Sequence, residues 1–155
     1  MAIETLAELF RYELSMALDA ERKSSKILPL LAGTSDNEQV QTQLRLHETE
    51  TIQQIHNIEQ CFQILKARPD NVVCEVPKAM KVELHMFMEH SQSNAMLTEF
   101  ILDAMVKMKQ FEIACYQILI QKAYLLEHET CVRLLQQNLL QEEVMIQRVH
   151  QAIKQ

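Results

Sequence analysis

The feature that most constrains the fold is the scarcity of chain-breaking residues. One glycine, Gly33, and three prolines, Pro29, Pro69 and Pro77, are spread over 155 residues. Sheet proteins need many turn residues, so a chain with so few of them forms a small number of long elements. Leu, Ile, Gln, Glu and Met dominate the sequence, and all five favour helix over strand. The sequence therefore predicts an all-α protein.

Length and charge narrow the class of protein further. A chain of 155 residues with 48% hydrophobic content is enough for one core, so we expect a single domain over residues 1–155. The net charge of −6 repels phosphate backbones, and no dense basic run is present, which argues against nucleic-acid binding. No apolar stretch approaches the ~18–20 residues of a membrane span. We expect neither a nucleic-acid partner nor a membrane.

The N-terminus and the cysteines bear on the compartment. The first residues, Met-Ala-Ile-Glu, lack the basic and then apolar pattern of a signal peptide. The four cysteines are widely spaced and include no Cys-x-x-Cys pair: Cys61, Cys74, Cys115 and Cys131. In a helical chain without a signal sequence, such cysteines are expected to be reduced thiols. The predicted location is the cytoplasm.

Apolar periodicity, interrupted by polar and proline-containing segments, predicts four long helices and one short helix. The second long helix is expected to start with a capping box of Ser35 and Glu38 and to run to about residue 67. The other helices are expected at about residues 3–31, 77–90, 95–126 and 129–153. Pro29 is expected to bend or fray the end of the first helix. The short helix lies in the connection between the second and third long helices. This connectivity predicts a ferritin-like four-helix bundle with one long crossover containing a short extra helix.

Each long helix carries one carboxylate near its midpoint, on the face that should be buried. Apolar residues at spacings of three and four mark that face, and the charged exceptions are Glu21, Glu50, Glu112 and Glu142. The 29 residues from Glu21 to Glu50 match the 30 from Glu112 to Glu142, as expected for two helix pairs related by a pseudo-twofold axis. Two antiparallel pairs would bring the four carboxylates to one level of the bundle.

Buried carboxylates must be protonated, hydrogen-bonded or neutralised by a cation, because burying them uncompensated costs several kcal/mol each. A dinuclear metal site of carboxylate oxygens and a nitrogen ligand is the known use of this geometry. His47 is the histidine placed to be that ligand, or else to donate a hydrogen bond to Glu50. Gln54 lines the same site. The alternative is that some of the glutamates lie at the edge of the buried face and reach solvent, so that they bind nothing.

Motifs in every long helix and in the crossover resemble one bacterial family. They are Leu9-Phe10-x-x-Glu13-Leu14, Ala20-Glu21, Leu28-Pro29, His47-x-x-Glu50-Thr51-x-x-Gln54, Ile58-Glu59-Gln60-x-Phe62, Cys74, Ala79-Met80, Phe111-Glu112-Ile113-Ala114-x-Tyr116, Leu134-Leu135-Gln136-Gln137 and Glu142-Glu143. In combination they resemble the YciE/YciF family of ferritin-like proteins, often described as stress-associated. The resemblance implies a homodimer and a link to oxidative or general stress.

The chain departs from this family at Lys109, Gln110 and Ile146, where the family usually keeps a glutamate, a histidine and an acidic residue. Lys109 leaves two hypotheses open. In the first, its side chain extends outward, and Glu21, Glu50, Glu112 and Glu142 with His47 hold one or two ions of iron or manganese. In the second, its ammonium neutralises the glutamates, and the bundle is a metal-free structural or protein-binding module. The sequence does not decide whether the protein is an enzyme.

Overall fold

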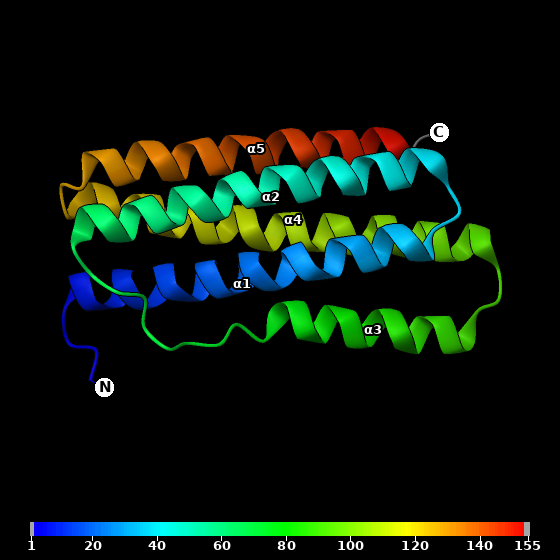
Figure 1. Ribbon diagram of the computed structural model, residues 1–155, viewed down its shortest axis with the longest axis horizontal. Helices are drawn as coiled ribbons and strands as arrows, with labels where there is room; N and C mark the ends of the chain where they lie inside the picture. The colour runs from blue at the N-terminus through cyan, green and yellow to red at the C-terminus, as the bar shows by residue number, and fades with distance from the viewer. Residues whose placement is uncertain (1, 154–155) are drawn as a thin grey trace.

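The computed structural model describes residues 2–153 and consists, over that range, of five α-helices joined by short loops and one longer crossover (Figure 1). The helices are α1 (Leu6–Thr34), α2 (Glu38–Leu65), α3 (Val76–His90), α4 (Asn94–Leu125) and α5 (Glu129–Ile153). The predicted all-α fold with a short helix in the crossover is confirmed. No helix in the described range combines the length and apolar character needed to cross a membrane.

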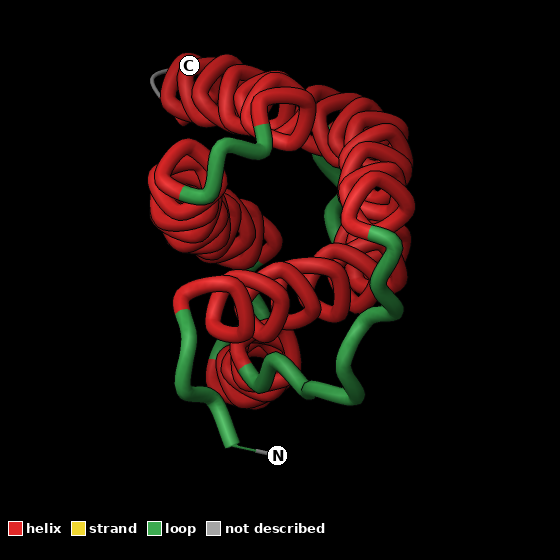
Figure 2. Tube along the Cα trace, turned by 90° about the vertical axis from the view of Figure 1, so that its left-hand side faces the viewer, coloured by secondary structure: helices red, strands yellow, loops and turns green. Residues whose placement is uncertain are grey.

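The four long helices form a bundle in which helices that pack against each other are antiparallel. α1 packs against α2 and α4, and α5 packs against the same two helices, so the order around the bundle is α1, α2, α5, α4. Figure 2 shows this ring of helices seen from one end. The short helix α3 packs outside the ring against α1 and α4. The chain is thus a ferritin-like four-helix bundle with one long crossover.

Side-chain caps mark where α1, α2 and α4 begin. Thr5 caps α1 in a capping box with Glu8: the Glu8 amide donates to Thr5 Oγ1 at 3.1 Å, and the Thr5 amide donates to Glu8 Oε2 at 2.9 Å. Asn37 caps α2, since its Oδ1 accepts the Val40 amide at 3.0 Å. The Ser93 hydroxyl accepts the Met96 amide and caps α4.

The junction between α1 and α2 differs from the prediction. α1 continues past Pro29 to Thr34, because its last turns bury Leu31 and Ala32 in the core and the proline removes only one backbone donor. Ser35 therefore follows the end of α1, and the predicted capping box of Ser35 with Glu38 is wrong. The Ser35 hydroxyl instead accepts the Asn37 amide at 3.2 Å.

Two apolar clusters fill the bundle, one toward each end. The first includes Phe10, Leu14, Ile58, Leu119 and Leu135. The second includes Leu28, Leu44, Leu84, Ile101 and Val149. Burying such side chains stabilises the fold by roughly 1.5–3 kcal/mol each. Between the two clusters the core is polar, and the candidate site lies there.

Candidate functional site

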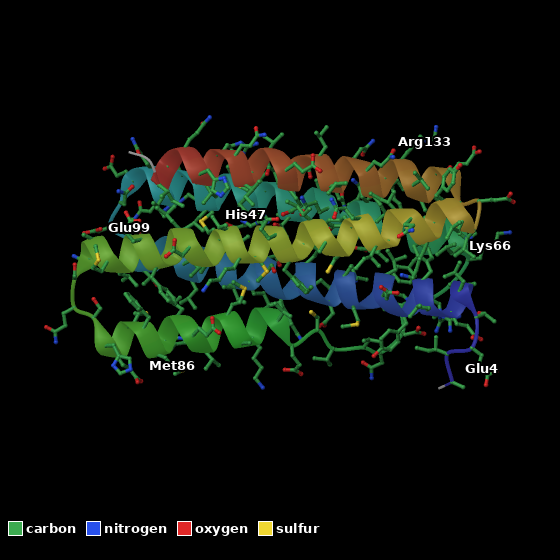
Figure 3. All side chains as sticks on the ribbon, turned by 180° about the vertical axis from the view of Figure 1, so that it is seen from behind. Glu4, His47, Lys66, Met86, Glu99 and Arg133 are labelled. Carbon is green, nitrogen blue, oxygen red and sulfur yellow. The ribbon has the colours of Figure 1, made fainter. Side chains whose placement is uncertain are left out.

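Five ionisable side chains meet at the middle of the bundle. They are Glu21 of α1, His47 of α2, Lys109 and Glu112 of α4, and Glu142 of α5. Each is at most 3% exposed, and Lys109 is completely buried. Lys109 and Glu112 are three residues apart and therefore share one face of their helix. Figure 3 shows His47 well inside the length of the bundle, among the long helices.

The ammonium group of Lys109 occupies the centre of this cluster. Its Nζ donates to Glu112 Oε2 at 2.5 Å and contacts Nε2 of His47. The same Nζ lies 2.6 Å from Glu142 Oε2, an ion pair whose angles fall outside hydrogen-bond geometry. One ligand atom each of His47, Glu112 and Glu142 lies within 4.8 Å of the others, as in a set that surrounds one cation. The cation at that place is the lysine.

Glu21 interacts with the charges of the cluster, but its hydrogen-bond partner is a separate residue, Tyr116. The Tyr116 hydroxyl donates to Glu21 Oε1 at 2.8 Å. Asn138 Nδ2 donates to the Tyr116 oxygen at 3.3 Å and to the Gln54 carbonyl at 3.1 Å. Asn57 Nδ2 donates in turn to Asn138 Oδ1 at 2.8 Å. A chain of buried polar groups therefore connects all four long helices beside the ionic cluster.

Tyr116, Asn57 and Asn138 were not among the predicted site residues. A signal for Asn138 was present in the sequence, because it lies one helical turn before Glu142 and therefore on the same face. Tyr116 likewise lies one turn after Glu112. The hydroxyl and the amides that these residues bring inward could have been read as partners for the carboxylates.

Glu50 does not join the buried cluster. Its carboxylate is half-buried and accepts from Arg148 Nη2 at 2.9 Å. The buried face of α2 follows His47, Thr51 and Gln54, spaced by four and three residues, so Glu50 stands to one side of it. The expectation of four carboxylates at one level thus holds for three of them. Gln54 is buried as expected, but its Oε1 has no hydrogen-bond partner among the described residues.

Burial and mutual repulsion favour protonated carboxyl groups in the cluster. Burial, helped by the charge of Glu142, raises the pKa of Glu21 to about 8. Burial likewise raises the pKa of Glu112, and that of Glu142 well above its usual range. Since three carboxylates would exceed one ammonium by two negative charges, retained protons bring the cluster toward neutrality.

The pKa values of Lys109 and His47 are shifted in opposite directions. Burial would lower the pKa of Lys109, but the Glu112, Glu142 and Glu21 carboxylates outweigh burial and raise it. Burial, together with the Lys109 charge, holds the pKa of His47 well below its usual range. We infer a charged lysine, and a neutral histidine whose Nε2 accepts from it.

These residues do not fit a dinuclear metal centre. An ammonium group lies 2.5 and 2.6 Å from two of the expected carboxylate ligands and contacts the nitrogen ligand. Glu50 is engaged by Arg148, and one oxygen of Glu21 is engaged by Tyr116. A metal ion at the same place would meet the charge of Lys109 directly. Within residues 2–153, His47 Nδ1 and at least one oxygen each of Glu21, Glu112 and Glu142 nevertheless have no hydrogen-bond partner, so these side chains keep unpaired polar atoms despite Lys109.

The fold and the site together define a class of protein: a ferritin-like helical bundle with a buried carboxylate and histidine cluster. Within that class, the chain belongs to the family described as a domain of unknown function, DUF892, whose sequence profile matches residues 5–155. It is similar to Protein YciF from Escherichia coli (strain K12), with 26% identity over 146 residues that cover 92% of this chain and 87% of that protein. The predicted resemblance to the YciE/YciF family is confirmed.

Two solved structures share the fold over nearly the whole chain. The E. coli stress protein YciF matches with a TM-score of 0.92 at 23% identity, covering 97% of this chain and 96% of that one. YcfI from Rhodopseudomonas palustris, a protein for which a structural role has been suggested, matches with a TM-score of 0.91 at 27% identity. That match covers 96% of this chain and 94% of that one.

Proposed function

We propose that this protein is a metal-independent member of its family, in which Lys109 takes the place of a metal cation. The bundle would then serve as a structural or protein-binding module. The observation that carries the proposal is the position of Lys109 Nζ, in contact with His47, Glu112 and Glu142 while completely buried. The ammonium group is hydrogen-bonded to His47 and Glu112, and it forms an ion pair with Glu142.

Compensation of buried charge explains why the lysine is held inside. Removing one partner of a buried ion pair costs about 3–5 kcal/mol, because the remaining charge is left without a counterion. Lys109 reaches partners on α2, α4 and α5, and so ties three helices at one level of the bundle. We interpret the cluster as a device that sets the register of these helices.

The closed surroundings of the cluster also favour a structural role. Its five members are at most 3% exposed, and the pocket of about 40 Å³ that His47 lines is too small for a substrate larger than a few atoms. The exposed surface of the bundle is then the part that meets partners. We propose a role in stress, by analogy with the relative described as a stress protein. We also propose a homodimer, which the resemblance to the YciE/YciF family implies. The four free thiols suit a reducing compartment such as the cytoplasm.

The second candidate function is a mononuclear iron or manganese site on His47, Glu112 and Glu142. The closeness of their ligand atoms, within 4.8 Å of one another, favours it. Carboxylate oxygens and an imidazole nitrogen are suitable donors for both metals. This function requires Lys109 to withdraw from the centre, since its charge opposes that of the metal.

Metal analysis of the purified protein separates the two candidates. The wild type is expressed with iron or manganese supplied, and its metal content is measured by mass spectrometry. We expect well below one ion per chain, unchanged by Glu112→Ala. A content of about one ion per chain that is lost in Glu112→Ala would support the metal site and overturn the proposal. Light scattering of the same samples tests the homodimer, which a monomer at micromolar concentration would contradict.

A further inference from the structure

Three sulfur-containing residues from separate parts of the chain line one pocket on the side of the bundle. The pocket has a volume of about 150 Å³ and lies among α1, the crossover and α4. Met16 of α1, Cys74 of the crossover and Cys115 of α4 contribute the sulfurs. Figure 3 shows several sulfur atoms, in yellow, along the region where these segments meet. Apart from Glu13, the other residues that line the pocket are apolar.

Hydrogen bonds from the crossover to α1 hold Cys74 at this pocket. The Cys74 amide donates to Asp19 Oδ2 at 2.7 Å, and its carbonyl accepts from Lys23 Nζ at 3.3 Å. Asp19 and Lys23 are themselves paired at 2.8 Å on α1. The side chain of Cys74 is therefore held at 1% exposure, whereas Cys115 is half-buried. Both thiols are free.

We propose that Met16, Cys74 and Cys115 form a binding site for a soft monovalent metal ion, Cu(I). Thiolate and thioether sulfurs are soft donors that select Cu(I), zinc or iron–sulfur clusters. Structural zinc sites take four strong ligands, and iron–sulfur clusters take four thiolates. The pocket offers two thiols and one thioether, and its carboxylate, Glu13, is paired with Lys122. This mainly sulfur donor set favours Cu(I) over zinc.

Charge and protons balance at this site. Each thiol loses its proton when it binds, so one Cu(I) and two thiols give a complex of net charge −1 and release two protons. The Cys74 backbone meets both signs of charge, since its carbonyl accepts from the Lys23 ammonium and its amide donates to the Asp19 carboxylate. Burial is the main reason that the pKa of Cys74 is raised, and it raises that of Cys115 to about 12.

The site is separate from the ionic cluster in the bundle core. None of the five cluster residues lines the sulfur pocket. The remaining two cysteines, Cys61 and Cys131, lie together between α2 and α5 in one apolar cluster. They are completely buried, and thus provide an internal control.

A competition titration tests the proposal. Reduced protein is titrated without oxygen into the coloured Cu(I) complex of bicinchoninate, and loss of its absorbance reports transfer of copper. We expect the wild type to withdraw about one Cu(I) per chain, and Cys74→Ser or Cys115→Ser to weaken binding at least about tenfold. Met16→Leu, which keeps the side-chain volume, should weaken binding by a smaller factor. Cys131→Ser is the matched control and should bind as the wild type does.

Circular dichroism of each variant establishes that it is folded, and Met16→Leu supplies a test if a cysteine variant does not fold. Failure of the wild type to compete with bicinchoninate would overturn the proposal. Equal copper affinity in the wild type and in the folded Cys74→Ser and Cys115→Ser variants would do the same. Loss of binding in Cys131→Ser alone would place the copper between α2 and α5 and would also contradict it.

Discussion

Lys109 of α4 and Glu142 of α5 face each other across the middle of the bundle, with Nζ 2.6 Å from Oε2 and neither side chain more than 1% exposed. A buried pair of this kind is stabilising only while both partners are present, because desolvation has already removed their hydration. The cluster around the pair is therefore sensitive to substitutions that change its charge, and less so to substitutions that keep it.

Removing the buried ammonium should destabilise the protein strongly. Lys109→Met keeps much of the side-chain length but leaves Glu112 and Glu142 without their cation. We expect the free energy of unfolding in urea at pH 7–8 to fall by about 3–5 kcal/mol. Lys122→Met is the matched control on the same helix, where the pair with Glu13 is partly exposed and should contribute only about 0–1 kcal/mol. Similar losses in the two variants would contradict a special role for Lys109.

Restoring a carboxylate at the same position should create metal binding. Lys109→Glu removes the opposing charge beside His47, Glu112 and Glu142, and adds a fourth donor. We expect this variant to retain iron or manganese and its melting temperature to rise when metal is added. The wild type should show no such rise under the same conditions. An Lys109→Glu protein that folds but takes up no metal would show that the lysine is not the obstacle.

The raised pKa of Glu21 predicts how stability changes with pH. Its pKa is about 8 in the folded protein against 4.5 for an unperturbed glutamate. Between these values the folded state holds a proton that the unfolded chain has lost, so this group lowers stability as the pH rises from about 4.5 to 8. Below 4.5 both states are protonated, and above 8 the loss is complete, at roughly a few kcal/mol.

Glu21→Gln isolates this contribution, since an amide oxygen can still accept from Tyr116. We expect a smaller decrease of unfolding free energy between pH 5 and 8 than in the wild type. The lowered pKa of His47 acts in the other direction below about pH 6.5, but it is common to both proteins and cancels in the difference. Glu59→Gln, at an exposed position of α2, changes the net charge equally and serves as the control. Parallel pH curves for Glu21→Gln and the wild type would refute the prediction.

The amide chain beside the cluster should also contribute to stability. Asn138→Ala removes the donor to Tyr116 and to the Gln54 carbonyl, and leaves Asn57 without its acceptor on that residue. Leaving buried polar groups unpaired costs about 1–3 kcal/mol, which urea unfolding can measure. Gln136→Ala, at a nearby exposed position of α5, should change stability by less than about 0.5 kcal/mol. Equal effects at the two positions would mean that the chain of hydrogen bonds is energetically unimportant.

Much of the molecule could be predicted because helical periodicity is a local property. The limits of the last helix, 129–153, agree with the structure, and the crossover with its short helix is where the breaks in the pattern placed it. Periodicity also placed Glu21, Glu112 and Glu142 on buried faces, together with His47 and Gln54. The metal role of these residues stays a prediction.

Other features depended on neighbours that are distant in sequence. Glu50 and Thr51 compete for the buried face of α2, and the position of α5, which carries Arg148, decides that Glu50 turns outward. The same holds for Asn57 and Asn138, whose pairing requires two helices to meet at one level.

The sequence by itself determined an all-helical bundle with carboxylates in its middle, because the spacing of apolar residues and the lack of breaks leave no other arrangement of the chain. It left open the direction of the Lys109 side chain, which could extend to solvent or turn inward. Only the tertiary structure decided this, by bringing His47 of α2 and Glu142 of α5 around the lysine nitrogen. The physical reason is that an ammonium group enters a core only where several partners from different helices replace its water.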